Sequence, residues 1–97
     1  MLVHSERLEG VCVTGDLSGN TKTLRGLCHQ VIVQPTTEST TYDFSITDPT
    51  GAVIFARTSE IGTLSEFVTI PLTGIYTMSV ENSTVDEAFT CQMMIQE

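Results

Sequence analysis

At 97 residues the chain has room for one domain with a thin hydrophobic core. Its 40% hydrophobic and 16% charged residues are typical of a folded protein and argue against a disordered one. Twelve acidic residues against four scattered basic ones give a net charge of −8, which argues against nucleic acid and anionic membranes as partners. The same charge favours a basic protein surface as a docking site.

The N-terminal third predicts two strands separated by a polar loop. Residues 1–6 are expected to form an N-terminal arm, and the first strand covers 7–14. Gly, Asp, Ser and Asn then gather over 15–20, which is typical of a turn. The second run, 21–34, is long enough either to bend at Gly26 or to divide into two strands.

Residues 41–58 predict a β-hairpin. Apolar and polar residues alternate over 42–47, so this strand has one apolar face. A turn follows in which Asp48 can bond its own backbone, Pro49 presets φ and Gly51 permits the exit. These turn residues are therefore predicted to be structural.

Residues 59–65 are expected to form a loop. The remaining strand signals lie at 66–70, 75–81 and 88–96, with a turn at 71–74 between the first two. Together they give seven or eight strands and no helix of useful length. The predicted fold class is all-β. We expect a single antiparallel β-sandwich, Greek-key or jelly-roll-like, that occupies residues 1–97 as one domain.

Gly74 and Tyr76 predict a structural contact. The segment from Leu72 to Tyr76 resembles the tyrosine corner of Greek-key sandwiches, in which a glycine lets the chain arch over. The tyrosine hydroxyl then bonds the backbone a few residues upstream. We therefore assign Gly74 and Tyr76 to the fold and not to a ligand site.

Three cysteines are an odd number, so they exclude a complete intramolecular disulfide framework, and they lack the spacing of a zinc site. Cys12 and Cys28 flank the first loop symmetrically and could face each other across a hairpin, where a disulfide would be allowed without being required. The first ten residues carry His, Glu and Arg where a signal peptide needs an apolar run. We therefore expect reduced, packed thiols in a protein made in the cytoplasm.

No catalytic residue, cofactor or metal site is predicted. His29 directly follows Cys28, and adjacent strand residues point to opposite faces, so the two do not form a catalytic pair. His4 lies in the expected arm. Five acidic residues could supply oxygen ligands to calcium, but they form no D-x-D-x-D-G loop: Asp43, Asp48, Glu60, Asp86 and Glu87.

Two resemblances bear on function. Residues 42–46, 48–51 and 74–80 are similar to bacterial pre-peptidase C-terminal domains, which are jelly-roll-like sandwiches appended to secreted enzymes. The whole chain, including 6–12 and 24–26, resembles small standalone β-sandwich proteins encoded among the head and morphogenesis genes of tailed bacteriophages. The second resemblance implies a cement or decoration protein that binds the outer capsid surface in many copies.

The resulting hypothesis is a non-enzymatic structural virion protein, made in the host cytoplasm, that bridges capsid subunits. Its expected partners are the major capsid protein or another virion protein and further copies of itself, with no nucleic acid and no membrane. The alternative is a carbohydrate- or surface-binding β-sandwich module, which predicts a calcium site or an aromatic platform. The expected partner contacts are the apolar residues of the arm and one outward-facing position near the C-terminus: Met1, Leu2, Val3, Leu8 and Met94.

Overall fold

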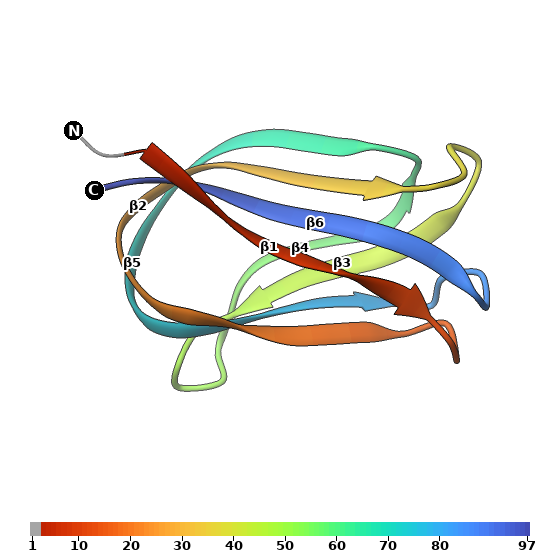
Figure 1. The fold of residues 1–97 in the computed structure, drawn as a ribbon, viewed down its shortest axis with the longest axis horizontal. Coiled ribbons are helices and arrows are strands. Elements are labelled where there is room, and N and C mark those ends of the chain that lie inside the picture. Colours follow the sequence, from red (N-terminus) through yellow and green to blue (C-terminus); the bar gives the residue numbers. More distant parts are fainter. Residues whose placement is uncertain (1–2) are drawn as a thin grey trace.

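The computed structural model describes residues 3–97 and contains, over that range, six strands and no helix. All six belong to one antiparallel sheet with the order β1-β6-β2-β5-β3-β4 (Figure 1). The all-β expectation is confirmed. The strands are β1 (Val3–Cys12), β2 (Leu17–Pro35), β3 (Thr41–Thr47), β4 (Val53–Ile61), β5 (Leu64–Glu81) and β6 (Glu87–Gln96).

The two longest strands, β2 and β5, pair along most of their length and bend together. The bend lies at Gly26 (φ 106°) and Gly74 (φ 108°), two residues that stand close to each other in the register of the pair. Such φ values strongly favour glycine, because a Cβ atom would clash with the backbone. The bend at Gly26, one of our two alternatives for residues 21–34, is therefore the one that the structure adopts.

Because of this bend the sheet folds over, so that its two halves face each other (Figure 1). The first half contains β1, β6, residues 27–35 of β2 and residues 64–72 of β5. The second half contains residues 17–24 of β2, the end of β5, β3 and β4. The buried apolar side chains of both halves form one core cluster between them.

Six strands replace the seven or eight that we predicted. The segment 71–74 is not a turn between strands but lies inside β5, since the chain bends there without leaving its partner β2. The segment 59–65, expected to be a loop, forms the end of β4 and the start of β5, with a short turn at 62–63. The expected arm is also wrong from Val3 onward, because β1 starts at that residue and pairs with β6. Met1 and Leu2 lie outside the described residues.

The core follows the predicted alternation of apolar and polar residues. In β3 and β6 every second residue is buried, as the sequence indicated. Tyr42 of β3 meets Phe89 of β6 edge-to-face at 5.0 Å between ring centroids, a contact that joins the two halves. The Tyr42 hydroxyl, fully buried, donates a hydrogen bond of 2.7 Å to the backbone carbonyl of Gly62.

The β3–β4 hairpin forms as predicted. The Asp48 side chain accepts hydrogen bonds from the backbone N–H groups of Thr50 (2.9 Å) and Ala52 (3.0 Å). The N–H of Gly51 donates to the Asp48 carbonyl at 3.0 Å and closes the turn. Pro49 packs on the bend of the sheet, because a Cβ placed on Gly74 would stand 2.7 Å from its Cγ.

Tyr76 bonds the backbone of its own strand. Its hydroxyl accepts a hydrogen bond from the N–H of Thr73 at 2.8 Å and makes a longer contact, 3.5 Å, with the carbonyl of Pro71. The N–H of Tyr76 donates to the hydroxyl of Thr21 across the β2–β5 pair at 3.0 Å. These bonds hold the region next to the bend.

Candidate docking surface

Of the described residues predicted to contact a partner, Val3 and Met94 share the outer side of the sheet, whereas Leu8 does not. Val3 is 55% exposed on the outer side of β1, and Met94 is partly exposed on the outer side of β6. Leu8 points the other way, which corrects its assignment as a surface contact. It packs against β2, where a Cβ on Gly19 would stand 2.6 Å from its Cδ1.

Leu17 makes the reciprocal contact, since a Cβ on Gly10 would stand 2.9 Å from its Cδ1. Each leucine thus fills the space over a glycine of the opposing strand. These two contacts close one side of the bent sheet, between β1 and the start of β2. Sequence reasoning missed them because nothing local pairs Leu8 with Gly19 or Leu17 with Gly10.

Val3 and Met94 belong to a broader surface, the outer side of the first half of the sheet, which we call the neutral face. Strand register defines it, because directly paired residues of a sheet share one side. Phe67, Gln30, Met94 and Ser5 form one row across four strands. The other rows are Pro71, Leu27, Gln96 and Val3; then Ser65, Ile32, Gln92 and Arg7; then Gln34, Thr90 and Glu9; then Ala88 and Val11.

The neutral face combines exposed apolar residues with amides and hydroxyls. Phe67 is 84% exposed, more than any other large apolar residue in the described part of the chain. Among these residues the face holds only two charges, Arg7 and Glu9, and they neutralise each other through a hydrogen bond of 2.9 Å. Aromatic residues and methionine in place of charges are typical of protein interfaces.

Phe67 was not among the predicted contacts. Its exposure follows from the alternation over 66–70, in which Glu66, Val68 and Ile70 point inward and Phe67 outward. The alternation is visible in the sequence. It identifies Phe67 as exposed only when the fold is known, because in the described part of the chain no helix covers the outer side of the sheet.

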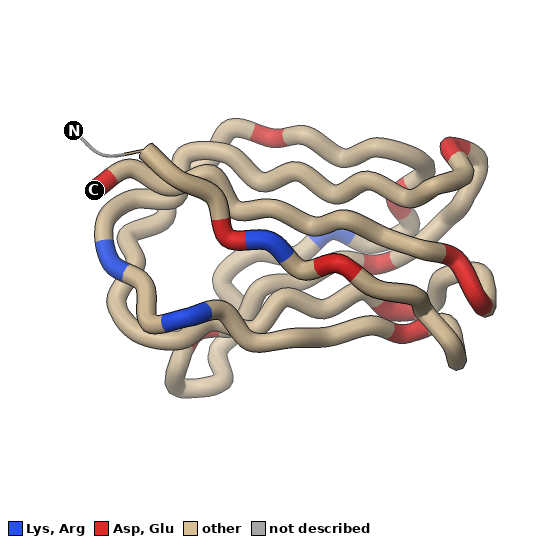
Figure 2. Tube along the Cα trace, in the orientation of Figure 1, with Lys and Arg blue, Asp and Glu red and all other residues tan. Residues whose placement is uncertain are grey.

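The acidic residues concentrate at the opposite end of the molecule from the bend. Four of the five chain connections meet there, between β1 and β2, β2 and β3, β4 and β5, and β5 and β6 (Figure 1). We call this the turn end. In the described chain it holds no Lys or Arg, and Figure 2 shows the acidic positions gathered there. Its acidic residues are Asp16, Glu38, Asp43, Glu60, Glu81, Asp86 and Glu87.

Several of these carboxylates hold the turns together. Glu87 accepts a hydrogen bond from the N–H of Thr37 at 2.7 Å, which joins β6 to the β2–β3 turn. Glu38, in that turn, accepts from the N–H of Thr63 at 3.0 Å and from its hydroxyl. These bonds hold the pKa of Glu38 below its ordinary value.

Asp43 and Asp16 make similar bonds to the β5–β6 turn. Asp43 accepts from the N–H of Ser59, which has φ 55°, and from the side-chain amide of Asn82, both at 2.8 Å. The Ser59 N–H is the main cause that lowers the pKa of Asp43. Asp16 accepts from the N–H of Asn82 at 3.2 Å. Asp43, Asp48 and Glu87, three of the five acidic residues weighed as calcium ligands, thus serve as acceptors for backbone N–H groups.

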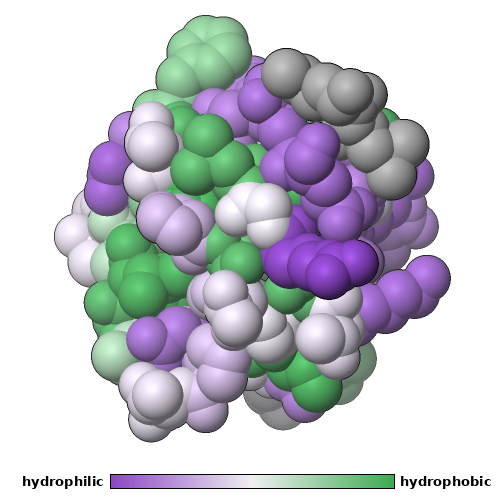
Figure 3. Space-filling view, turned by 90° about the vertical axis from the view of Figure 1, so that its left-hand side faces the viewer, coloured by the Kyte–Doolittle hydropathy of each residue, from purple (hydrophilic) through white to green (hydrophobic). Residues whose placement is uncertain are grey.

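The opposite end, at the bend, is more apolar. Figure 3 shows hydrophobic residues gathered on this end of the molecule. Ile75 is 48% exposed next to Gly74, and Val53 is 61% exposed at the start of β4. Lys22 and Arg25 also lie near the bend, together with Asp48 and Glu97, so this end combines apolar residues with charges of both signs, in contrast to the acidic turn end (Figure 2).

The three cysteines are buried and free. The prediction that Cys12 and Cys28 could face each other across a hairpin is wrong. Cys12 pairs with Glu87 near the turn end, whereas Cys28 pairs with Ile95 near the bend. Burial raises the pKa of each thiol, that of Cys91 to about 12.

The histidines form no catalytic arrangement among the described residues. His29 lies at an irregularity of the β2 register, and its Nε2 is buried without a hydrogen-bond partner. The Cys28 thiol donates to the carbonyl of Gln30 at 3.5 Å instead of meeting His29. His4 belongs to β1 and not to a free arm. Its Nδ1 lies 3.6 Å from Oε2 of Glu97.

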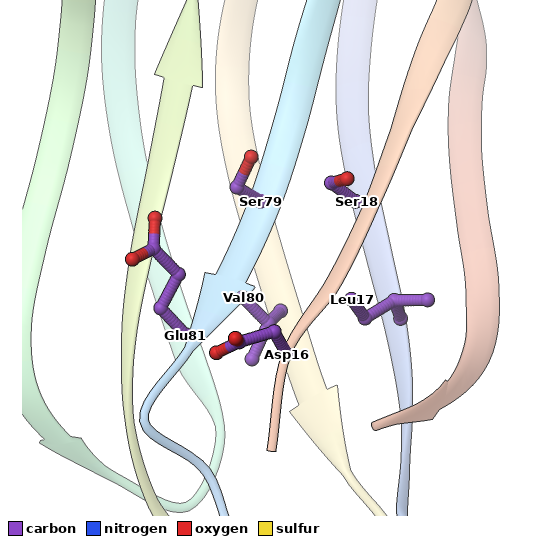
Figure 4. Close-up of a pocket in the computed structure, with 6 residues that line it drawn as sticks. All are labelled: Asp16, Leu17, Ser18, Ser79, Val80 and Glu81. Carbon is purple, nitrogen blue, oxygen red and sulfur yellow. The ribbon is translucent and has the colours of Figure 1, made fainter. Parts of the chain in front are cut away.

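A shallow depression of about 240 Å³ lies on the second half of the sheet. Figure 4 shows its lining, with Ser18 and Ser79 side by side and the carboxylates of Asp16 and Glu81 nearby. Its residues include no histidine, cysteine or lysine. Over the described residues no group of His, Cys, Asp and Glu has the arrangement of a metal site, and no helix is long and apolar enough to cross a membrane.

The fold and the surface define a small all-β protein that has one sheet face without net charge and one acidic end. No family model and no curated protein matches the chain. Among solved structures it is similar to PliG of Aeromonas hydrophila, a periplasmic inhibitor of g-type lysozyme, with TM-score 0.51 and 17% identity over 94% of this chain and 86% of that one. At this identity the likeness shows the fold alone.

Two other structures are more distant. PirA matches with TM-score 0.46 and 10% identity over 95% of this chain and 92% of that one. The infectious bursal disease virus Gx strain structure matches with TM-score 0.44 and 9% identity over 96% of this chain and 30% of that one.

Proposed function

We propose that the protein is a non-enzymatic structural component of a bacteriophage virion, a cement or decoration protein that binds the outer capsid surface and bridges subunits. It is made in the host cytoplasm and acts in the virion. Its bent sheet serves as a compact Greek-key or jelly-roll-like sandwich that presents surfaces to other proteins. The whole-chain resemblance to small phage head proteins supports this proposal.

The observation that carries the proposal is the segregation of surface chemistry. The neutral face holds one internal ion pair, whereas the turn end holds seven of the twelve acidic residues. Surfaces of such different character on one small body suit contacts with different protein partners. The turn end fits a basic patch on the capsid exterior, because like charge would repel it from packaged DNA.

Co-sedimentation with expanded capsids of the encoding phage tests the proposal. We expect binding that weakens as salt rises, since exposed charges are screened over about 8–10 Å at physiological ionic strength. The double variant Glu81→Gln/Asp86→Asn should weaken binding roughly threefold to tenfold. Asn tolerates the φ of 65° at position 86.

The matched control is Glu6→Gln/Glu97→Gln, which removes the same number of charges away from the turn end. We expect it to bind capsids as the wild type does. A protein that stays in the supernatant refutes the capsid function. Equal weakening by both double variants refutes the assignment to the turn end.

A carbohydrate-binding module is the second candidate. The observation in its favour is an open depression at the bend, lined by polar side chains that include Asn20, Thr47 and Thr77, with Pro49 and Ile75 beside them. Its lining includes no aromatic ring on which a sugar could stack. A glycan array separates the two, because selective binding that is lost in Thr77→Val would favour this module.

A further inference from the structure

We propose that the neutral face is the contact surface for a second copy of this chain, in a twofold dimer whose turn ends point in opposite directions. This goes beyond capsid binding and does not depend on it.

Charge selects the neutral face as the surface on which two copies meet. Each copy carries a net charge of −8, and a twofold contact through the turn end would place carboxylates against carboxylates, because such a contact brings the same patch of both copies together. The two charges of the neutral face, Arg7 and Glu9, already pair within one copy. Like-charge juxtaposition is strongly unfavourable at interfaces, and the neutral face avoids it.

The chemistry of the neutral face also complements itself. In a twofold contact the same patch meets its own copy, so each polar group needs a partner of its own kind. Glutamine amides and serine or threonine hydroxyls both donate and accept hydrogen bonds, whereas a carboxylate only accepts. The central strands β2 and β6 supply such groups through Gln30, Gln34, Gln92 and Thr90.

Apolar residues supply the anchors that a stable dimer needs. Phe67 is 84% exposed and lies beside Gln30, with Met94 next in the same row and Ile32 in the adjacent one. The amide of Gln30 is held by a hydrogen bond of 2.9 Å to Ser65, so the surface around Phe67 is ordered. Exposed Phe and Met side chains are enriched at protein interfaces relative to the rest of the surface.

The size of the molecule limits the contact. Its two longer extents, 37 and 23 Å, set an upper limit of about 850 Å² on the face, against ~800 Å² per partner in a standard interface. A specific dimer would therefore cover nearly the whole neutral face. This explains why the face carries so few charges over its entire extent and not only around Phe67.

Repulsion between the turn ends fixes the orientation. Two copies stacked on the neutral face can point their turn ends in the same direction or in opposite directions. Only the second arrangement keeps the acidic residues of the two copies apart, by about the 37 Å length of one copy. A twofold axis across the strands then places the edge formed by residues 64–72 over its counterpart, so Phe67 lies near Phe67 of the second copy.

Sedimentation equilibrium of the purified protein tests the dimer. We expect a mass of about twice 10.6 kDa that falls to the monomer on dilution. Phe67→Glu should raise the dissociation constant by about tenfold or more, because it puts a charge at the apolar anchor that meets its own copy across the twofold axis. Val53→Glu, at a 61% exposed position of the second half, is the matched control and should leave it unchanged.

Salt and cross-linking provide two independent readouts. Added salt should strengthen the dimer, since it screens the repulsion between two acidic chains, whereas it should weaken capsid binding. Under mild oxidation Phe67→Cys should form a disulfide-linked dimer and Val53→Cys should not. Monomer at every concentration, equal effects of the two glutamate variants, or a dimer that weakens with salt would each overturn the proposal. A monomer that still sediments with capsids would overturn the dimer alone.

Discussion

The hydroxyl of Tyr42 offers a direct test of how the two halves of the sheet are held. Tyr42 is 1% exposed, and its hydroxyl donates at 2.7 Å to the carbonyl of Gly62 in the β4–β5 turn. Tyr42→Phe removes this donor, so the carbonyl of Gly62, a buried residue, loses the hydrogen bond from the tyrosine hydroxyl. We expect a loss of about 1–3 kcal/mol in the free energy of unfolding, because an unsatisfied buried polar group is more costly than the loss of an exposed hydrogen bond.

For a domain of this size a loss of 1 kcal/mol lowers the Tm by roughly 4–8 °C, so Tyr42→Phe should lower it by about 5–20 °C. Chemical denaturation followed by circular dichroism measures the change in free energy. The control is Tyr76→Phe, whose hydroxyl bonds the N–H of Thr73, an exposed residue that water can satisfy. We expect the smaller loss there. If Tyr76→Phe destabilises the protein more than Tyr42→Phe, the reasoning from burial is wrong.

Three further predictions concern the turn end, the thiols and the bend. The pKa values of Glu38 and Asp43 are lowered in the folded protein, so their contribution to stability is fully present above their ordinary pKa values and is lost as the pH falls through the folded ones. The Tm should therefore decrease when the pH is lowered below about 4.5, since ordinary carboxyl pKa values lie near 4. This decrease should be less steep in Glu38→Gln, which lacks one of these carboxyls. The buried thiols should resist a thiol reagent at pH 8 and react fully only in denaturant; fast reaction of any native thiol would contradict the burial. Gly26→Ala should prevent folding or lower the Tm far more than Gly51→Ala, because a Cβ at Gly26 meets the backbone of Gln96 whereas nothing lies within 4 Å at Gly51; equal effects would refute the role of the bend.

The sequence predicts single strands well and their connections less well. Alternation over 42–47 and 88–96 places the correct residues in the core. Side chains of a strand point to opposite sides in turn, so the strand can bury its apolar side chains in only one orientation. The segment 71–74 misled us because Pro and Gly signal a turn from local preference. In the structure the long pairing of β2 with β5 keeps the chain in the sheet through that segment, and tertiary contacts override the local signal.

The candidate surface could be predicted only in part. Met94 and Val3 were named from their position in an alternating or terminal segment, and both lie on the neutral face. Leu8 was assigned wrongly, because the glycine that receives its side chain, Gly19, belongs to another strand and appears in no local pattern. The rows of the neutral face depend on register between four strands, which a single sequence does not encode locally.

The segregation of charge follows from the way the chain closes its turns. Carboxylates accept backbone N–H groups well, and four of them, Asp16, Glu38, Asp43 and Glu87, join turns that the fold brings to one end. A protein that uses acidic side chains in this way accumulates negative charge at that end, so contacts between copies are favoured elsewhere. The neutral face lies along the strands and not at their turns, and a dimer formed through it leaves one acidic end free at each pole. In the proposed dimer, two free ends of the same charge, separated by the length of the body, would suit contact with two basic surfaces.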